Sequence, residues 1–197
     1  MKFFFAVLIL VQSASYAQSP SDYYFEIPAY PSSYTAGTVA ARMVDALGFR
    51  YYWGTEGLTA EDLAYQPSLE ARTSAETIDH IYELSKVLVN ATKQLPNDFT
   101  KSEGEVLAFE EKRTQTLKNI QEASEILRES TNDDLELYKI VFISDNGRTE
   151  YPFWNQLNGP LADAIWHVGQ VVSFRRATGH PFNSNVSVLR GKLKEEK

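Results

Sequence analysis

The chain has 197 residues, of which 26 are acidic, 19 are basic and none is cysteine, and its formal net charge at pH 7 is −7. The absence of cysteine excludes disulfide bonds, thiolate metal ligands and cysteine nucleophiles. The acidic balance argues against a nucleic-acid partner, because such a partner needs a basic surface to neutralise its phosphates.

The first 17 residues predict export. A basic start at Lys2 is followed by an apolar run over Phe3–Val11 and by small residues that end at Ala17. This is the layout of a secretory signal peptide cleaved after Ala17. The run is shorter than the ~20 apolar residues that span a bilayer, so no stable membrane insertion is expected after cleavage. We therefore expect a periplasmic or secreted protein, with an uncleaved N-terminal anchor as the alternative.

The mature chain has the length of a single domain with one core. Residues 18–34 are rich in Pro, Ser and Tyr and are expected to form an extended lead-in. Residues 35–181 are expected to form the domain, and residues 182–197 a polar C-terminal tail.

Apolar residues at helical spacing predict a first helix that starts near Thr35. Gly54 and Gly57 are expected to bring this helix to a close. The connection that follows is expected to be mostly irregular, with one helical turn at 59–63.

Two further helices are predicted downstream. The first of these begins at a capping box, in which Thr73 and Glu76 satisfy each other's free backbone donors, and Pro96 halts it. The next is expected over Ser102–Ser130, with Val106 among its inward-facing residues.

The period of the apolar residues then changes from 3.6 to 2 on either side of Asn146-Gly147, which predicts a β-hairpin. A fourth helix is expected from about Trp154 to Gly179, with Pro181 just beyond its end. Four long helices and one small hairpin predict an all-α fold, a four-helix bundle with a β-hairpin before the last helix.

Two of the three histidines fall on predicted inward helix faces. His80 shares the face of the apolar residues of the second helix, and His167 lies four residues after Asp163 on the fourth. Residues at positions i and i+4 of a helix can bind one ion together. A buried histidine is also commonly a packed core residue with one hydrogen-bond partner. Both interpretations are open on this pattern alone.

Two stretches of the sequence resemble the DinB-like superfamily. Residues 57–84, GLTAEDLAYQPSLEARTSAETIDHIYEL, place a histidine one and a half turns into the second helix. Residues 162–181, ADAIWHVGQVVSFRRATGHP, resemble the fourth-helix signature of this family, His-x-x-x-His followed by x-Gly-Gln and a closing Gly-x-Pro. The resemblance covers residues 36–181 and implies a four-helix bundle with up-down-down-up topology.

Many members of this superfamily bind a divalent metal through three histidines at one end of the bundle. By resemblance, His80 takes the place of the second-helix ligand and His167 that of the second histidine of the fourth-helix pair. Asp163 replaces the first histidine of that pair. Aspartate is a good ligand for zinc, nickel, manganese and iron, so a divalent transition metal is expected there. A member that has lost its metal is the alternative.

Five neighbouring residues have weaker assignments. Gln170 is expected either to donate a hydrogen bond to the ligand set or to pack on the first helix, and Trp166 and Arg175 to line the substrate opening or the outer face. Arg176 is expected on the outer face. His180 lies past the end of the helix and is expected to be an exposed loop residue far from the metal ligands.

Two classes of function follow. The resemblance implies a metal-dependent enzyme that acts on a small molecule, with hydrolysis as the default reaction. The superfamily includes thiol S-transferases and a thiol-dependent isomerase, but their thiols are mainly cytosolic, and the predicted export counts against this branch. The other class is a non-catalytic exported binding or structural protein with packed histidines. A homodimer is compatible with both classes.

Overall fold

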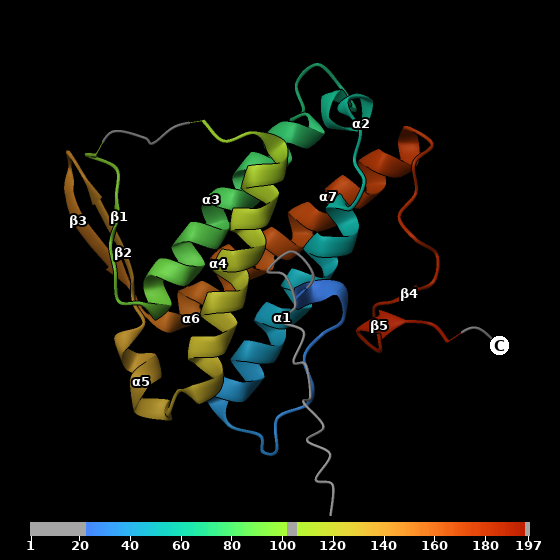
Figure 1. Cartoon of the computed structure of the whole chain (residues 1–197). Helices are drawn as coiled ribbons and strands as arrows, with labels where there is room; N and C mark the ends of the chain where they lie inside the picture. The colour runs from blue at the N-terminus through green and yellow to red at the C-terminus, as the bar shows by residue number, and fades with distance from the viewer. Residues whose placement is uncertain (1–22, 102–105, 196–197) are drawn as a thin grey trace, which may run out of the picture.

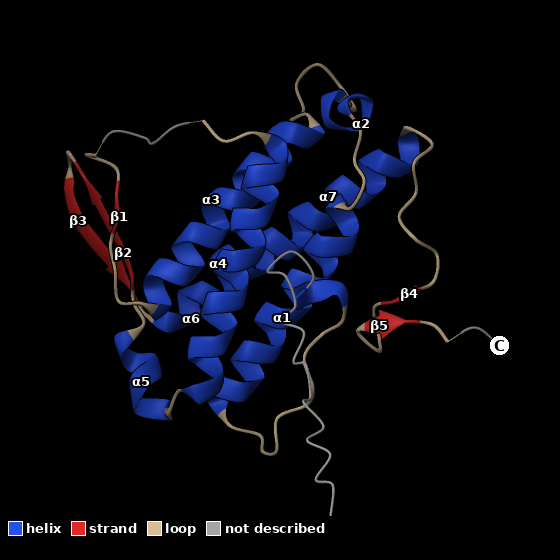
Figure 2. Ribbon diagram, viewed as in Figure 1, coloured by secondary structure: helices blue, strands red, loops and turns tan. Residues whose placement is uncertain are grey.

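A computed structural model describes residues 23–101 and 106–195, and over these residues the protein is mostly helical with small strand pairs (Figures 1 and 2). The predicted signal peptide, residues 1–17, lies outside the described residues. The long helices of the described part are α1 (Ala36–Thr55), α3 (Ser74–Thr92), α4 (Phe109–Glu129) and α7 (Ala162–Ala177). The short ones are α2 (Ala60–Ala64), α5 (Asn132–Leu137) and α6 (Phe153–Gln156).

The four long helices pack side by side. Helix α1 packs against α4 and α7, and α3 packs against the same two helices. In Figure 1, α3 and α4 run in one direction and α1 and α7 in the other. The core between them is apolar, and burial stabilises each of its large side chains by about 1.5–3 kcal/mol. Its fully buried residues include Leu47, Phe49, Tyr51, Ile78, Ile81, Leu88, Leu117, Ile120, Leu127, Val168 and Val171.

Both predicted helix N-termini, at residues 35 and 73, are confirmed. Thr35 caps α1, and its Oγ1 accepts from the backbone N–H of Thr38 at 3.1 Å. Thr73 and Glu76 form the predicted capping box: the backbone N–H of Glu76 donates to Thr73 Oγ1 at 3.1 Å, and that of Thr73 to Glu76 Oε2 at 2.8 Å. Such caps stabilise a helix by about 1 kcal/mol each.

The predicted start of the third long helix is wrong. Helix α4 begins at Phe109, not at Ser102. Residues 102–105 lie outside the described residues, residues 106–108 are not helical, and Val106 is 90% exposed instead of inward-facing. The physical reason is a local cap: the side chain of Glu111 accepts from the backbone N–H of Ala108 at 3.0 Å and fixes the first turn.

The predicted hairpin is confirmed. Strands β2 (Ile140–Ser144) and β3 (Gly147–Tyr151) are antiparallel, and Gly147 has a φ of 113°, which favours glycine. A third strand, β1 (Asn97–Asp98), pairs with β2 in parallel and gives the order β1-β2-β3. Strand β1 could not be predicted, because two residues are too few to show an alternating pattern.

The fourth long helix is interrupted, which corrects the prediction of one continuous helix from Trp154. Helix α6 is followed by a π-helical turn, Leu157–Leu161, and only then by α7. Pro160 has no N–H to donate, and Gly159 adopts a non-helical ψ of −109°. The end of the helix agrees with the prediction, since Gly179 has a φ of 83°.

The segment before α1 is not merely extended. Residues 23–25 form a 3-10 turn, and Tyr24 is only 1% exposed. Its hydroxyl donates to Asp45 Oδ1 at 3.2 Å, and Asp45 also accepts from Ser124 and Arg128. Burial raises the pKa of the Asp45 carboxyl, against the lowering effect of Ser124 and Arg128. This network attaches the expected lead-in to α1 and α4.

The expected polar tail also has structure. It forms a small hairpin of β4 (Val186–Ser187) and β5 (Lys192–Leu193), and Val186 is buried. The backbone N–H of Ile27 donates to the carbonyl of Gly191 at 2.8 Å. The two segments that flank the helices therefore hydrogen-bond to each other, which their polar composition did not indicate.

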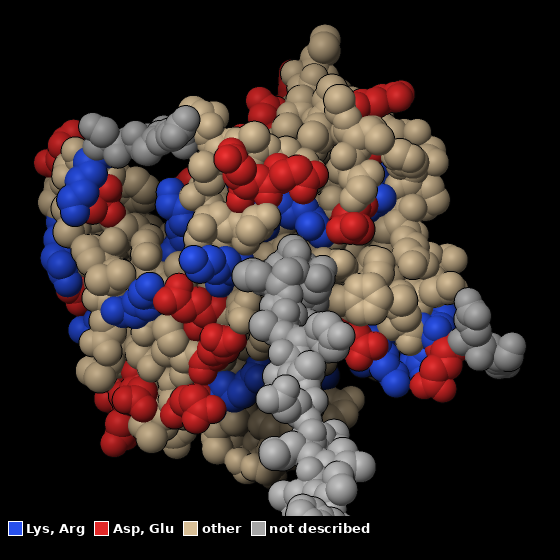
Figure 3. Space-filling model, in the orientation of Figure 1, with Lys and Arg blue, Asp and Glu red and all other residues tan. Residues whose placement is uncertain are grey.

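No helix within the described residues combines the length and the apolar character needed to cross a bilayer. On the face seen in Figure 3, acidic and basic side chains are interspersed. This face therefore has no single sign of charge.

Helices α1 and α4 approach closely at Gly37. A Cβ atom at this position would lie 2.5 Å from the carbonyl oxygen of Leu127 and 2.7 Å from that of Ser130. Both are backbone atoms and cannot move aside by changing a rotamer. Gly37→Ala is therefore expected to destabilise the fold by about 1–3 kcal/mol.

The matched control is Gly169→Ala, at a position on α7 with nothing within 4 Å of the added Cβ. Alanine is the better helix former, so this change is expected to stabilise by about 0.5–1 kcal/mol. Urea unfolding of both variants measures the two effects. A Gly37→Ala variant as stable as wild type would contradict the close packing of α1 on α4.

Candidate metal centre

The structure brings His80, Asp163 and His167 together between α3 and α7. His80 Nε2 lies 3.2 Å from Asp163 Oδ2, and His167 Nε2 lies 3.2 Å from Asp163 Oδ1. One donor atom from each residue can be chosen so that all three lie within 4.8 Å of one another. The carboxylate thus lies between two imidazoles that come from different helices.

Local structure explains this placement. Asp163 is in the first turn of α7, directly after the interruption at Pro160, and His167 follows one turn later on the same side. Helix α3 packs against α7, and this packing places His80 beside Asp163. The side chains are 30% exposed for His80, 36% for Asp163 and 13% for His167. The cluster is therefore half-buried, and solvent or a small molecule can reach it.

Gln170 orients one of the two imidazoles. Its Oε1 lies 2.9 Å from Nδ1 of His167. An amide oxygen only accepts hydrogen bonds, so with the Gln170 amide in this orientation Nδ1 of His167 is the donor of the bond. This leaves Nε2, the atom nearest Asp163, as the one available for a metal ion. Metal-binding histidines are commonly held in this way by a hydrogen bond from the other ring nitrogen.

Aromatic contacts surround His167. Trp166 is 70% exposed, and its ring stacks on that of His167 at 13° with the centroids 6.3 Å apart. The ring of His80 meets His167 edge-on, at 85° and 4.7 Å. These contacts restrict rotation of the His167 ring, which keeps its Nε2 directed at the carboxylate.

The donor set fits a divalent transition metal. Zinc binds histidine nitrogen and carboxylate oxygen at about 2.0–2.2 Å, which places donors of a tetrahedral site about 3.4 Å apart. Each histidine nitrogen lies 3.2 Å from an oxygen of Asp163, which is close to this spacing, but the two distances run to different oxygens, Oδ2 for His80 and Oδ1 for His167. With these three residues as ligands, a tetrahedral ion would keep one position for a substrate.

His180 is not part of the cluster. It lies beyond the end of α7 with 54% of its side chain exposed, as expected, but it has a partner that the sequence did not indicate. Its Nδ1 lies 2.8 Å from Oδ2 of Asp62, a carboxylate that is 1% exposed. Asp62 also accepts from the hydroxyl of Thr178 and from the backbone N–H and hydroxyl of Thr59.

The surroundings of Asp62 decide its ionisation. Burial disfavours the charged form, but the hydrogen bonds from Thr178, His180 and Thr59 outweigh burial and hold the pKa of Asp62 well below its usual range. The carboxylate joins α2 to the residues that follow α7. We assign Asp62 a structural role, because both of its carboxylate oxygens already accept hydrogen bonds within the protein.

The two arginines of α7 differ in their placement. Arg175 is buried, and its guanidinium donates to the carbonyls of Trp53 and Gly54 at 3.2 and 3.0 Å, so it caps the end of α1. It lines neither an opening nor the outer face, contrary to expectation. Arg176 lies on the outer face, as expected, over the ring of Phe182.

Comparison of the chain with protein-family models, with curated proteins and with solved structures found no match. The resemblance to the DinB-like superfamily therefore stays a prediction from two stretches of sequence. Two observations favour a metal centre: the geometry of His80, Asp163 and His167, and the hydrogen bond between His167 and Gln170.

Proposed function

We propose that this chain is an exported, DinB-like metal-dependent enzyme in which His80, Asp163 and His167 hold one divalent transition metal ion. The observation that carries the proposal is the convergence of two imidazole nitrogens on one carboxylate, each 3.2 Å away, with one imidazole oriented by Gln170. Two histidines and a carboxylate are a common ligand set for zinc, nickel, manganese and iron.

The arrangement of the helices supports the DinB-like part of the proposal. Such a fold is an up-down-down-up four-helix bundle with its metal ligands on the second and fourth long helices. Here α1, α3, α4 and α7 pack in a ring of neighbours, and their directions in Figure 1 agree with that order. The candidate ligands come from α3 and α7, the second and fourth of these helices.

The chemistry proposed for this site is hydrolysis of a small molecule. A bound divalent ion supplies Lewis-acid chemistry, which polarises an electrophilic substrate and favours attack by water. Asp163 offsets part of the charge of the ion, and Gln170 keeps the His167 ring in the required tautomer. The predicted signal peptide makes the periplasm or the exterior of the cell the proposed location.

Calorimetric titration of the tag-free protein with zinc, nickel and manganese tests this proposal. One binding site per chain is expected for at least one of these ions, and His80→Ala and Asp163→Ala should each abolish it. Glu83→Ala is the control, because Glu83 is on α3 and pairs with Lys86 outside the cluster. Absence of binding in wild type would instead favour a non-catalytic protein with packed histidines.

Gln170→Leu is expected to weaken metal binding without unfolding the chain. Loss of the Nδ1 partner frees the His167 ring to rotate and to change tautomer, and partners of this kind typically contribute 10–100-fold in affinity. Calorimetric affinities of wild type, Gln170→Leu and Gln170→Glu measure the effect. Gln170→Glu keeps an acceptor and should retain tight binding, whereas an unchanged affinity in Gln170→Leu would contradict the orienting role.

A further inference from the structure

A groove lies between α1 and the α5–α6 region, apart from the histidine cluster. Its volume is about 1120 Å³, somewhat above the range in which drug-sized ligands bind. None of its lining residues belongs to the cluster of His80, Asp163 and His167. Several large apolar side chains at the groove are exposed: Tyr34, Val39, Met43 and Trp154 are 98, 52, 48 and 74% accessible.

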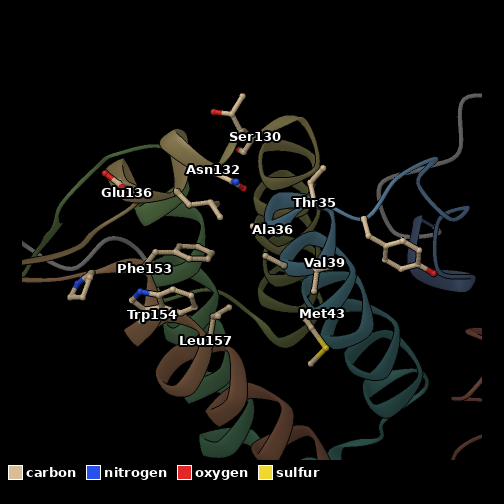
Figure 4. A pocket seen from close by; sticks show the side chains of 15 residues that line it. Thr35, Ala36, Val39, Met43, Ser130, Asn132, Glu136, Phe153, Trp154 and Leu157 are labelled. Carbon is tan, nitrogen blue, oxygen red and sulfur yellow. The ribbon is translucent and has the colours of Figure 1, made fainter.

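The two ends of the groove differ in polarity (Figure 4). One end is polar and carries Asn132 and Glu136, both on α5, whereas the hydroxyl of Ser130, just before α5, is hydrogen-bonded to Ile126 and Tyr138. The other end is apolar, and its residues include Val39, Met43, Phe153, Trp154 and Leu157. Residues 35, 39 and 43 are spaced by one turn each and form a straight wall about 12 Å long. A groove of this shape matches an elongated molecule with an apolar body and a polar head.

The charge at the polar end favours a cationic head. Among the described residues that line the groove, Glu136 is the only charged one. Over the described residues, neither Glu136 nor Asn132 has a side-chain hydrogen-bond or ion-pair partner within the protein.

The dipole of α1 does not offset this preference. The N-terminus of α1 is at the polar end, but Gly37 packs it against the carbonyls of Leu127 and Ser130 at the C-terminus of α4. The positive end of one helix thus lies beside the negative end of another, and their fields oppose each other.

We propose that this groove binds a cationic amphiphile, an alkylammonium-type molecule whose alkyl chain lies between Val39, Met43 and Trp154 and whose head lies beside Glu136. Burial of the alkyl chain against the exposed side chains supplies the affinity. The carboxylate supplies discrimination, because an anionic head of the same chain length would meet Glu136 with like charge.

Titration calorimetry with decylammonium and with decanoate, each below its micellar concentration, tests the proposal. Wild type is expected to bind decylammonium saturably and about two- to fivefold more tightly than decanoate. Trp154→Ala should weaken binding of both about tenfold, since an aromatic contact is lost. Glu136→Lys should reverse the preference for the ammonium head.

Glu70→Lys is the matched control, because it changes the net charge equally at an exposed loop residue outside the groove. It should keep the binding of wild type, and circular dichroism should show every variant folded. The proposal is overturned if decylammonium does not bind saturably, if Trp154→Ala keeps full affinity, or if Glu136→Lys behaves like Glu70→Lys. It is also overturned if sedimentation shows a dimer that Trp154→Ala dissociates, because a second copy would then occupy the groove.

Discussion

His167→Ala is expected to abolish the metal-dependent rise in melting temperature while the fold survives. An ion at 100 times its dissociation constant stabilises the folded state by about 2.7 kcal/mol, which raises the melting temperature of a chain of this size by about 5–10 °C. The His167 ring supplies one ligand nitrogen and is oriented by Gln170. Replacing His167 with alanine therefore removes the ligand together with its hydrogen bond to Gln170. The apolar faces of the long helices, which hold the core, are unchanged.

Thermal unfolding of wild type and variant, each with and without added zinc or nickel, measures this effect. His180→Ala is the control: it removes a histidine that contacts Asp62 outside the cluster, so its metal-dependent rise should remain. Four melting temperatures that do not respond to metal would contradict the site. His167→Ala would then cost about 1–3 kcal/mol through its lost packing and the unpaired Gln170 alone.

Asp62→Asn is expected to destabilise the protein by about 3 kcal/mol at neutral pH. The carboxylate accepts from Thr59, Thr178 and His180, and the side chain is almost fully buried. An asparagine has one oxygen and one NH₂ group, and the NH₂ group cannot accept a hydrogen bond from Thr59, Thr178 or His180. At least one of these bonds would be lost, and the groups that formed it would be left unpaired in a buried position. Urea unfolding at neutral pH, compared with wild type, measures the loss.

The same carboxylate predicts a pH dependence. Its folded-state pKa is held below its unfolded value, which is about 3.9, so its stabilising contribution is present above that pH and is lost as the pH falls through the folded pKa. The wild type should therefore lose stability more steeply than Asp62→Asn in acid. The control is Asp145→Asn, at an exposed hairpin residue, which should keep the wild-type slope. Equal slopes for all three proteins would contradict the assignment to Asp62.

Features encoded within a few residues were predictable from the sequence. The capping box needs only Thr73 and Glu76, and the hairpin turn needs only Asn146-Gly147, because each structure forms between neighbours along the chain. The i, i+4 relation of Asp163 and His167 follows from the helix in the same way.

The interruption of the fourth long helix had a signal that periodicity alone does not reveal. Gly159-Pro160 stands in the middle of the predicted helix, and proline removes a backbone donor there. The apolar residues continue at helical spacing across the interruption, so the pattern favours one helix although the backbone changes its path.

Features that depend on distant parts of the chain were not predictable. The pairing of β1 with β2 and the bond between Ile27 and Gly191 join segments far apart in sequence. Val39 and Met43 fall at helical spacing, yet they are about half exposed because no helix within residues 23–101 and 106–195 covers that part of α1. The approach of His80 to Asp163 likewise depends on the packing of α3 on α7, which only a resemblance to a known fold could suggest.

Elemental analysis of the protein, purified without a histidine tag and without chelator, tests the central proposal most directly. We expect about one equivalent of zinc, nickel, manganese or iron per chain, and its loss in a variant that combines His80→Ala with His167→Ala. A wild-type protein without transition metal, even after incubation with each of these ions and removal of the excess, would contradict a metal centre at His80, Asp163 and His167.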